Sequence, residues 1–298
     1  MSSHRRVVNG ALEMGLVIAW SSGFIGARMA ADTTSIYQVL FWRFALVTLV
    51  LAPFVALQMR KGLTARDLAI QALLGVLAMF AYLALGVKSI ALGVPTGTAA
   101  LISALQPLMT AALAGPLLGE LVRGRQWAGL ALGFCGVALA VGGEAGQAPA
   151  LAYGLSFGAT VALVIATLAA KALNSAVSLV AGLGIQSAVT ALLFMPLAIG
   201  DGGLVPTVTA QFAAAVAWFI VFSTIIGYGL YWLCLQRSSA TRIGSLIYLT
   251  PPVTMIWGWA MFGEPLHPAA VGALALCAAG VYLARQPQPA PASPSNAT

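Results

Sequence analysis

Charged residues are scarce in this chain of 298 residues: aspartate, glutamate, lysine and arginine make up 7% of it, whereas 60% is hydrophobic. A soluble domain of this size cannot cover so much apolar surface, so a soluble fold is excluded. Because a helix that crosses a bilayer needs about 20 apolar residues, the chain has room for about ten spans. The loops between them must be short, and no soluble domain fits.

Cysteine and histidine are rarer still, with three and two copies. Cys135, Cys234 and Cys277 stand singly in apolar runs, without a CxxC pair or a nearby histidine, so we interpret them as packing residues. No metal and no cofactor are expected. The apolar runs also lack paired carboxylates or a nucleophile with a base, which argues against a membrane-embedded enzyme.

Acidic residues are missing from the predicted span interiors. All seven lie near span ends or in loops: Glu13, Asp32, Asp67, Glu120, Glu144, Asp201 and Glu264. His4 and His267 are peripheral as well. Since a proton relay in a membrane protein uses buried acidic or histidine side chains, the sequence gives no sign of one.

Ten apolar runs are separated by charged residues or by glycine and proline. They lie near residues 11–31, 36–58, 68–89, 94–118, 126–143, 149–170, 177–199, 210–234, 241–262 and 267–284. The sequence therefore predicts an all-α integral membrane protein of ten transmembrane helices.

The basic residues predict the orientation of these spans. With the N-terminus in the cytoplasm, two basic residues fall outside, Arg28 and Lys88, and eleven fall inside: Arg5, Arg6, Arg60, Lys61, Arg66, Arg123, Arg125, Lys171, Arg237, Arg242 and Arg285. Lysine and arginine accumulate in cytoplasmic loops. Both termini are therefore expected in the cytoplasm of a bacterial inner (plasma) membrane.

The second half of the chain repeats the first. Shifted by 144 residues, residues 101–140 align with 245–284 with 12 of 40 positions identical. The identities include Pro107 with Pro251 and the Gly-Glu pairs at 119–120 and 263–264. Internal duplication in a membrane protein is typical of transporters.

Each repeat holds five predicted spans, an odd number, so the second copy must enter the membrane from the opposite side. Two inverted copies can exchange conformations, which is the physical basis of alternating access at a shared central site. The expected division is a cytoplasmic N-terminus at 1–10, a first repeat at 11–143, an inverted second repeat at 149–284 and a disordered cytoplasmic tail at 285–298.

Two stretches resemble a known family. GVPTGTAALISALQPLMTAALAGPLLGE at 93–120 and its second copy IGSLIYLTPPVTMIWGWAMFGEPL at 243–266 are similar to the EamA-type repeat of the drug/metabolite transporter superfamily. Within that superfamily the ten-span bacterial amino acid exporters are most alike. The resemblance implies a basket of two inverted five-helix repeats around a central cavity, bordered by the third, fourth, eighth and ninth spans and parts of the first and sixth.

Arg43 is the one full charge predicted well inside a span. An ionisable group at membrane depth costs at least about 2.5 kcal/mol unless it is paired or hydrated, so Arg43 should face the bundle interior or a cavity. One interpretation makes it the counter-charge of a substrate carboxylate. The other makes it an anchor that bonds to helix ends or extends to the membrane surface.

Pro107 and Pro251 are predicted in the middle of their spans, preceded by Gln106 and Thr250. Proline removes a backbone donor and frees a carbonyl one turn earlier, which can bind a substrate or merely bend the helix. The matched prolines are candidate hinges. Gln106 and Thr250 are candidate substrate ligands.

Aromatic residues with a polar tip lie on the spans that the family resemblance assigns to the cavity. Rings suit an apolar side chain and hydroxyls suit a polar end, although most Trp and Tyr residues of membrane proteins anchor at the interface. This set consists of Trp20, Tyr82, Tyr228, Tyr231, Trp232 and Tyr248, and the candidates for substrate binding among them are Trp20, Tyr82, Tyr228 and Tyr248.

These features predict an exporter of small metabolites, with neutral or aromatic amino acids expected first, that works by facilitated or weakly coupled alternating access. A multidrug or organic cation exporter and a channel-like pore stay open as alternatives. The expected partners are a small-molecule substrate and the lipid bilayer, without nucleic acid. One chain is expected to suffice for function, and an oligomer is not excluded.

Overall fold

The computed structural model describes residues 3–30, 35–94, 99, 102–141, 148–263 and 268–284, and every regular element in this part is helical. The predicted tail at 285–298 lies outside the described residues. So do Asp32, Glu144, Glu264 and His267.

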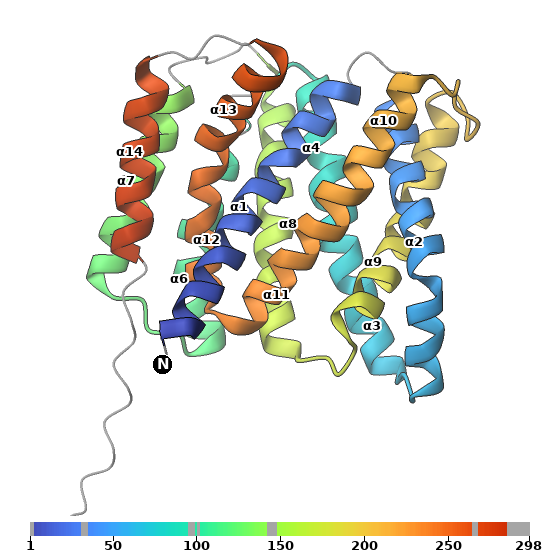
Figure 1. The fold of residues 1–298 in the computed structure, drawn as a ribbon, viewed down its shortest axis with the longest axis horizontal. Helices are drawn as coiled ribbons and strands as arrows, with labels where there is room; N and C mark the ends of the chain where they lie inside the picture. The colour runs from blue at the N-terminus through green and yellow to red at the C-terminus, as the bar shows by residue number, and fades with distance from the viewer. Residues whose placement is uncertain are drawn as a thin grey trace, which may run out of the picture.

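The first half contains α1 (Ser3–Ala30), α2 (Ile36–Arg60), α3 (Ala65–Leu74), η1 (Gly75–Ala81), α4 (Tyr82–Ala91), α6 (Gln106–Leu118) and α7 (Gly124–Val141). The second contains α8 (Ala150–Leu173), α9 (Leu179–Gly200), α10 (Ala210–Trp218), η2 (Phe219–Tyr228), α11 (Gly229–Arg237), α12 (Ala240–Leu246), η3 (Ile247–Leu249), α13 (Thr250–Phe262) and α14 (Pro268–Ala284). The helices stand side by side, with α7 and α14 at one end of the row and α2 at the other (Figure 1).

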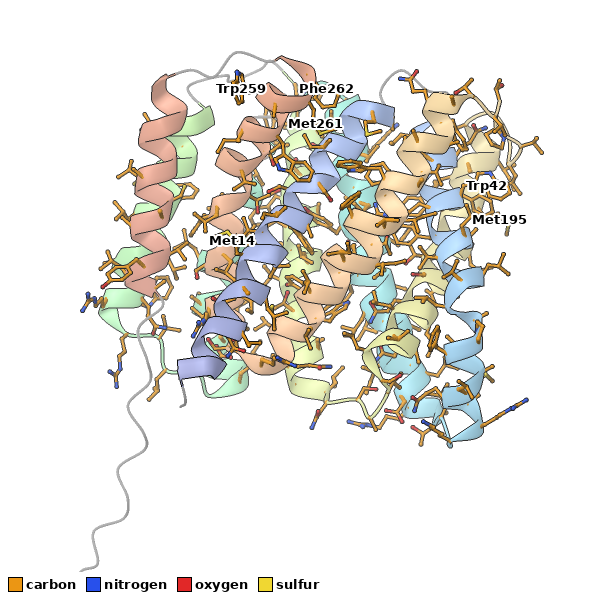
Figure 2. All side chains as sticks on the ribbon, viewed as in Figure 1. Met14, Trp42, Met195, Trp259, Met261 and Phe262 are labelled. Carbon is orange, nitrogen blue, oxygen red and sulfur yellow. The ribbon has the colours of Figure 1, made fainter. Side chains whose placement is uncertain are left out.

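Within the described part, five continuous helices are long and apolar enough to cross a membrane. They are Ile36–Arg60, Ala65–Ala91, Ala150–Leu173, Leu179–Gly200 and Ala210–Arg237. Large apolar side chains such as Met14, Trp259 and Met261 point away from the bundle (Figure 2) and are 53%, 54% and 46% exposed. Such an apolar exterior suits lipid, so the chain is a multi-pass membrane protein.

The two halves begin and end their helices at matched residues. Ser35 and Ser178 cap α2 and α9 with their side chains, and Thr64 and Thr209 do the same for α3 and α10. Each hydroxyl accepts a bond from a backbone N–H that the helix leaves free. These pairs lie 143 and 145 residues apart, close to the 144-residue offset of the sequence repeat.

The fourth span of each half is also matched in length. Helices α6 and α13 start at Gln106 and Thr250 and both contain 13 residues. Each ends on a glycine with positive φ, Gly119 and Gly263, both at φ 67°. Glycine adopts this left-handed geometry without steric cost, so the shared Gly-Glu motif begins with the residue that stops the helix.

The matched prolines do not lie inside continuous helices, as the sequence had suggested. Pro107 and Pro251 both occupy the first turn of their helix, after a turn at 104–105 and after η3, respectively. The missing proline N–H costs nothing there, because first-turn N–H groups have no partner within the helix. In the fourth predicted spans of both halves, 94–118 and 241–262, the α-helix is therefore interrupted just before the proline, by a turn in the first half and by a 3₁₀ segment in the second.

Glycines allow α7 and α14 to touch. A Cβ built on Gly129 would lie 2.6 Å from the carbonyl oxygen of Gly280, and one built on Gly280 would lie 2.6 Å from the amide nitrogen of Gly133. Small residues that permit backbone contact are the usual means of helix association in lipid. This pair therefore depends on three glycines, one of them in the second repeat.

Arg60, Lys171 and Arg237 stand at or near the ends of α2, α8 and α11. We call this side of the bundle the basic edge. On the opposite side, Gln38 and Trp42 of α2 donate hydrogen bonds to the carbonyl oxygens of Gly203 and Leu204, at 2.8 Å each. These two bonds link the halves on the side opposite the basic edge.

Candidate functional site

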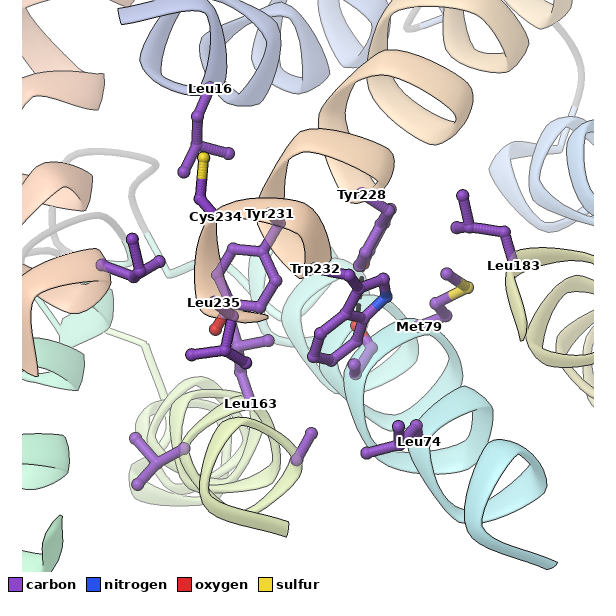
Figure 3. Close-up of a cluster of buried hydrophobic side chains, with 14 of the residues drawn as sticks. Leu16, Leu74, Met79, Leu163, Leu183, Tyr228, Tyr231, Trp232, Cys234 and Leu235 are labelled. Carbon is purple, nitrogen blue, oxygen red and sulfur yellow. Dashed lines mark hydrogen bonds between the residues drawn. The ribbon is translucent and has the colours of Figure 1, made fainter. Parts of the chain in front are cut away.

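Three aromatic rings meet in the interior of the bundle. Trp20 of α1 packs on Tyr228 and Tyr231, with centroid separations of 5.3 and 4.8 Å. Tyr231 and Trp232 are adjacent on α11 and pack edge to face, above Leu163 of α8 (Figure 3). The structure thus brings together two predicted ligands, Trp20 and Tyr228, from different halves of the chain. We call Trp20, Tyr228 and Tyr231 the aromatic cluster.

The hydroxyls of this cluster have polar partners. Tyr231 shares a hydrogen bond with Thr167 of α8, and the side chain of Gln106 also interacts with Tyr231. Tyr228 donates a hydrogen bond of 2.7 Å to the carbonyl oxygen of Ala78 in η1. A buried tyrosine needs such a partner, so the rings are fixed in place by groups on three other elements.

Two of the three tyrosines predicted as ligands, Tyr82 and Tyr228, lie at the end of a π-helical segment. Tyr82 directly follows η1, and Tyr228 is the last residue of η2. The segments start at Gly75 and Phe219, 144 residues apart. A π-helical stretch widens the helix and often marks a functional position. Tyr82 is partly buried and packs against the same core as the aromatic cluster.

Helices α6 and α13 carry buried polar atoms that have no hydrogen-bond partner among the described residues. These are the Nε2 of Gln106 and the Oγ1 atoms of Thr110, Thr250 and Thr254. Gln106 matches Thr250 and Thr110 matches Thr254 at an offset of 144 residues. Leaving such a group unsatisfied costs about 1–3 kcal/mol, so its presence at matched positions in both halves calls for a reason beyond folding.

Arg43 faces the bundle interior, as predicted, and is 1% exposed. Its Nε donates to the hydroxyl of Thr224 at 2.7 Å, and its Nη2 donates to the hydroxyl of Ser223 at 2.9 Å. The guanidinium also lies 4.7 and 4.8 Å from the ring centroids of Phe44 and Phe219. These contacts tie α2 to η2 and do not extend to the surface.

Tyr248 is separate from the aromatic cluster. Its ring packs on Gly133 of α7, where a Cβ would come within 2.5 Å, and it shares a core with Leu130 and Cys277. Its hydroxyl is buried without a hydrogen-bond partner among the described residues. The backbone carbonyl of Thr250, in contrast, accepts a bond of 3.2 Å from Ser21, which places the start of α13 beside α1 and its Trp20.

Sequence reasoning missed a chain of amides beside this site. The Nε1 of Trp232 donates to Oε1 of Gln186 at 3.0 Å, and the Nε2 of Gln186 donates to Oε1 of Gln71 at 2.7 Å. Both glutamines are buried: Gln71 is 7% exposed and Gln186 is 3% exposed. Uncharged amides inside apolar runs were the available signal, and only Gln106 was recognised by it.

Glu13 is more deeply buried than its predicted place near a span end suggested. Helix α1 begins at Ser3, so Glu13 lies within its third turn, is 2% exposed and forms a 2.8 Å ion pair with Arg242 of α12. Glu120 accepts bonds from the Ala240 amide at 3.0 Å and the Thr241 hydroxyl at 3.2 Å. Both carboxylates therefore attach α12 to the first half.

Comparison with known proteins agrees with this architecture. Two segments of the chain, residues 11–142 and 150–286, match the EamA-like transporter family. The chain belongs to this family. It is thereby a membrane transporter of the drug/metabolite transporter superfamily, and its relatives are transporters rather than enzymes.

This EamA-like transporter is 28% identical to the probable terminal-alkyne amino-acid exporter of Streptantibioticus cattleyicolor, with 90% of each chain covered. It is 26% identical to the uncharacterized inner membrane transporter YedA of Escherichia coli K12, covering 86% of this chain and 83% of that one. A solved structure described only as the crystal structure of a protein is similar in fold, with a TM-score of 0.77 at 19% identity over 93% of this chain and 97% of that one.

Proposed function

We propose that this EamA-like transporter exports small metabolites, neutral or aromatic amino acids first among them, by alternating access of two inverted five-helix repeats. The paired helix starts, the paired breaks before α6 and α13 and the paired π-helical segments support two copies of one unit. In Figure 1, α8 ends on the side of the bundle where α1 begins, in keeping with the inversion that an odd number of spans demands.

The unpartnered polar atoms of Gln106, Thr110, Thr250 and Thr254 carry this proposal. They stand in the first two turns of two half-length helices, near the positive end of the helix dipole, which attracts anionic groups. Beside them, the aromatic cluster offers rings to an apolar side chain. A solute with a carboxylate and an apolar side chain fits this combination.

The charges near the site favour a neutral or zwitterionic solute over a cation. Arg43 is buried one element away, at η2, whereas the described carboxylates of Glu13 and Glu120 are engaged with α12 at the basic edge. A cationic drug prefers the opposite arrangement. The amino-acid export named for the relative from Streptantibioticus cattleyicolor points to the same class of solute.

We place the protein in the bacterial inner membrane with both termini in the cytoplasm and the basic edge on the cytoplasmic side. The eleven-to-two distribution of basic residues supports this orientation, and the relative from Escherichia coli is named an inner membrane transporter. Labelling single cysteines placed at Lys61 and Val205 with a membrane-impermeant thiol reagent tests it. In intact cells that lack an outer-membrane barrier, only position 205 should react.

Counterflow in proteoliposomes tests the transport mechanism. Preloaded amino acid should accelerate uptake of labelled amino acid through a carrier, whereas an open pore shows no acceleration. The Gln106→Leu variant should lose most of this exchange while remaining folded, because the Nε2 that it removes has no hydrogen-bond partner among the described residues. Exchange of organic cations but not amino acids would overturn the proposed substrate.

Transport should be facilitative or only weakly coupled to protons. Glu13, the most deeply buried of the described carboxylates, is neutralised by Arg242. Uptake into proteoliposomes should change by less than about twofold when a pH gradient is imposed. A severalfold stimulation would show coupling, with Glu13 as the first residue to examine by a Glu13→Gln substitution.

A further inference from the structure

We propose that a pocket at the basic edge is a second solute site, where Lys171 and Gln71 bind the carboxylate of the solute before it reaches the aromatic cluster. This inference rests on the proposed export function and adds a recognition step to it. The pocket lies between α3, α8, α9 and α11, apart from the broken helices α6 and α13.

The pocket has the size and access that a small metabolite needs. Its volume is about 390 Å³, within the range of ligand sites. Leu74, Leu179 and Leu235 supply apolar walls, and Asn174 and Ser178, which are exposed, lie at its mouth. An amino acid therefore fits with its side chain against leucines and its polar end near the amides and Lys171.

The hydrogen-bond chain at the floor has a direction. Trp232 donates to Gln186 and Gln186 donates to Gln71, so both amide oxygens are occupied as acceptors. Gln71 comes last in this chain and lines the pocket, and its Nε2 is a donor that the chain does not use. The relay thus presents N–H groups to the pocket, and its natural complement is an acceptor such as a carboxylate.

Lys171 supplies the positive charge. The other described residues that line the pocket have uncharged side chains. The carboxylate of Glu120 also attracts Lys171, but both Glu120 oxygens already accept hydrogen bonds from α12. Asp67, one turn before Gln71, is likewise engaged with Ser175 at 3.0 Å. A carboxylate in the pocket therefore meets donors whose acidic neighbours, Glu120 and Asp67, already accept hydrogen bonds from other groups.

Trp232 forms the boundary between this pocket and the aromatic cluster. One edge of its indole donates to Gln186 at the pocket floor, while its ring packs at 5.0 Å on Tyr231. The side chain is 6% exposed, so it closes the direct path in this conformation. A shift of Trp232 joins the two sites, so a solute that enters from the cytoplasmic side binds in the pocket before it reaches the aromatic cluster.

Side-specific kinetics test the inference. In proteoliposomes of known orientation, Lys171→Met and Gln71→Leu should each raise KM for an amino acid presented at the basic edge about tenfold, the factor for one charged hydrogen bond. The KM from the opposite side should stay within twofold. Lys171→Arg should restore the wild-type value, and Lys61→Met, on the same edge away from the pocket, is the matched control.

A carboxylate-free analogue distinguishes recognition from a structural effect. The KM for the corresponding amino acid amide should not rise in Lys171→Met, because the amide lacks the negative charge that Lys171 binds and carries only the positive one. Equal loss for acid and amide, or an unchanged KM for the acid, would overturn the pocket proposal. Absence of any exchange by the wild-type protein would instead contradict the proposed export function.

Discussion

Helices α2 and α9 are the second spans of the two repeats, but they carry different residues at the matching position that contacts the other repeat. The eighth residue after the capping serine is Arg43 in α2 and Gln186 in α9. Arg43 bonds to the hydroxyls of η2, in the other repeat. Gln186 packs its backbone on Gly75 of η1, again in the other repeat, and bonds to Gln71 and Trp232.

The difference shows how one duplicated backbone acquires unequal chemistry. In each repeat the second span contacts the π-helical segment of the opposite repeat, so this contact is itself duplicated. The guanidinium only donates hydrogen bonds, and its bonds end at two hydroxyls. The amide both donates and accepts, so Gln186 can bond to Gln71 and to Trp232, which both line the pocket.

Making the two positions alike should have the largest effect. Arg43→Gln loses two hydrogen bonds to a charged group, worth about 1.5–3 kcal/mol each, and leaves Thr224 buried beside a shorter side chain. We expect Tm in detergent to fall by several degrees and transport to fall more than tenfold. Arg60→Gln, at the exposed end of the same helix, is the control.

Arg43→Lys then separates the two interpretations of this residue. A lysine keeps the charge but cannot reproduce the planar fork that reaches both hydroxyls. Recovery of transport without recovery of Tm indicates a counter-charge for the solute. Loss of both indicates an anchor for η2.

Gly75→Ala disturbs the contact between η1 and α9 by adding a methyl group to it. The new Cβ would lie 2.8 Å from the carbonyl oxygen of Gln186, so α9 must move away from η1. Overpacking of this kind costs about 1–3 kcal/mol. Gly86→Ala, in α4 with no atom within 4 Å of its added Cβ, should leave Tm unchanged or raise it.

Gln186→Leu should have a smaller effect, because it removes side-chain bonds and leaves the backbone contact in place. Trp232 Nε1 and Gln71 Oε1 lose their partners, at a cost of about 1–2 kcal/mol overall. Gln186→Glu keeps an acceptor for Trp232 but buries a carboxyl group against the amide oxygen of Gln71, so its Tm should fall below that of Gln186→Leu. Equal Tm for all three proteins would show that the relay does not stabilise the fold.

Thr110→Val and Thr254→Val should change stability least and in the opposite direction. Each removes a buried hydroxyl without a hydrogen-bond partner among the described residues, so Tm should stay level or rise by an amount equivalent to about 1 kcal/mol. Transport should nevertheless fall, as for a site that trades stability for function. Thr190→Val is the contrast, because its hydroxyl bonds to Gln186 and Gly75 carbonyls and its loss should lower Tm.

The helical fold and the family were predictable from sequence because apolar runs and a 144-residue repeat are properties of the chain itself. The breaks before Pro107 and Pro251 were not. Proline permits either a kink or a first-turn position, and local sequence does not choose between them. The π-helical segments left no residue signature at all, since they depend on packing across the two repeats.

Candidate site residues were predictable only by type. Trp20 and Tyr228 come together as a pair, whereas Tyr248 packs on Gly133, because helix rotation decides which face a residue presents. The burial of Glu13 was missed because α1 starts at Ser3, earlier than its apolar run. Partners distant in sequence, such as Gln71 and Gln186, are fixed only by the tertiary arrangement.

Arg43 has a consequence for how the protein is made. Its hydrogen-bond partner Thr224 follows 181 residues later in the chain. At about 5–20 residues per second, the ribosome needs roughly 10–40 s to deliver that partner after Arg43 has been synthesised. During this interval the nascent first repeat carries an unmatched guanidinium at membrane depth, so the insertion machinery must shelter it until the second repeat arrives.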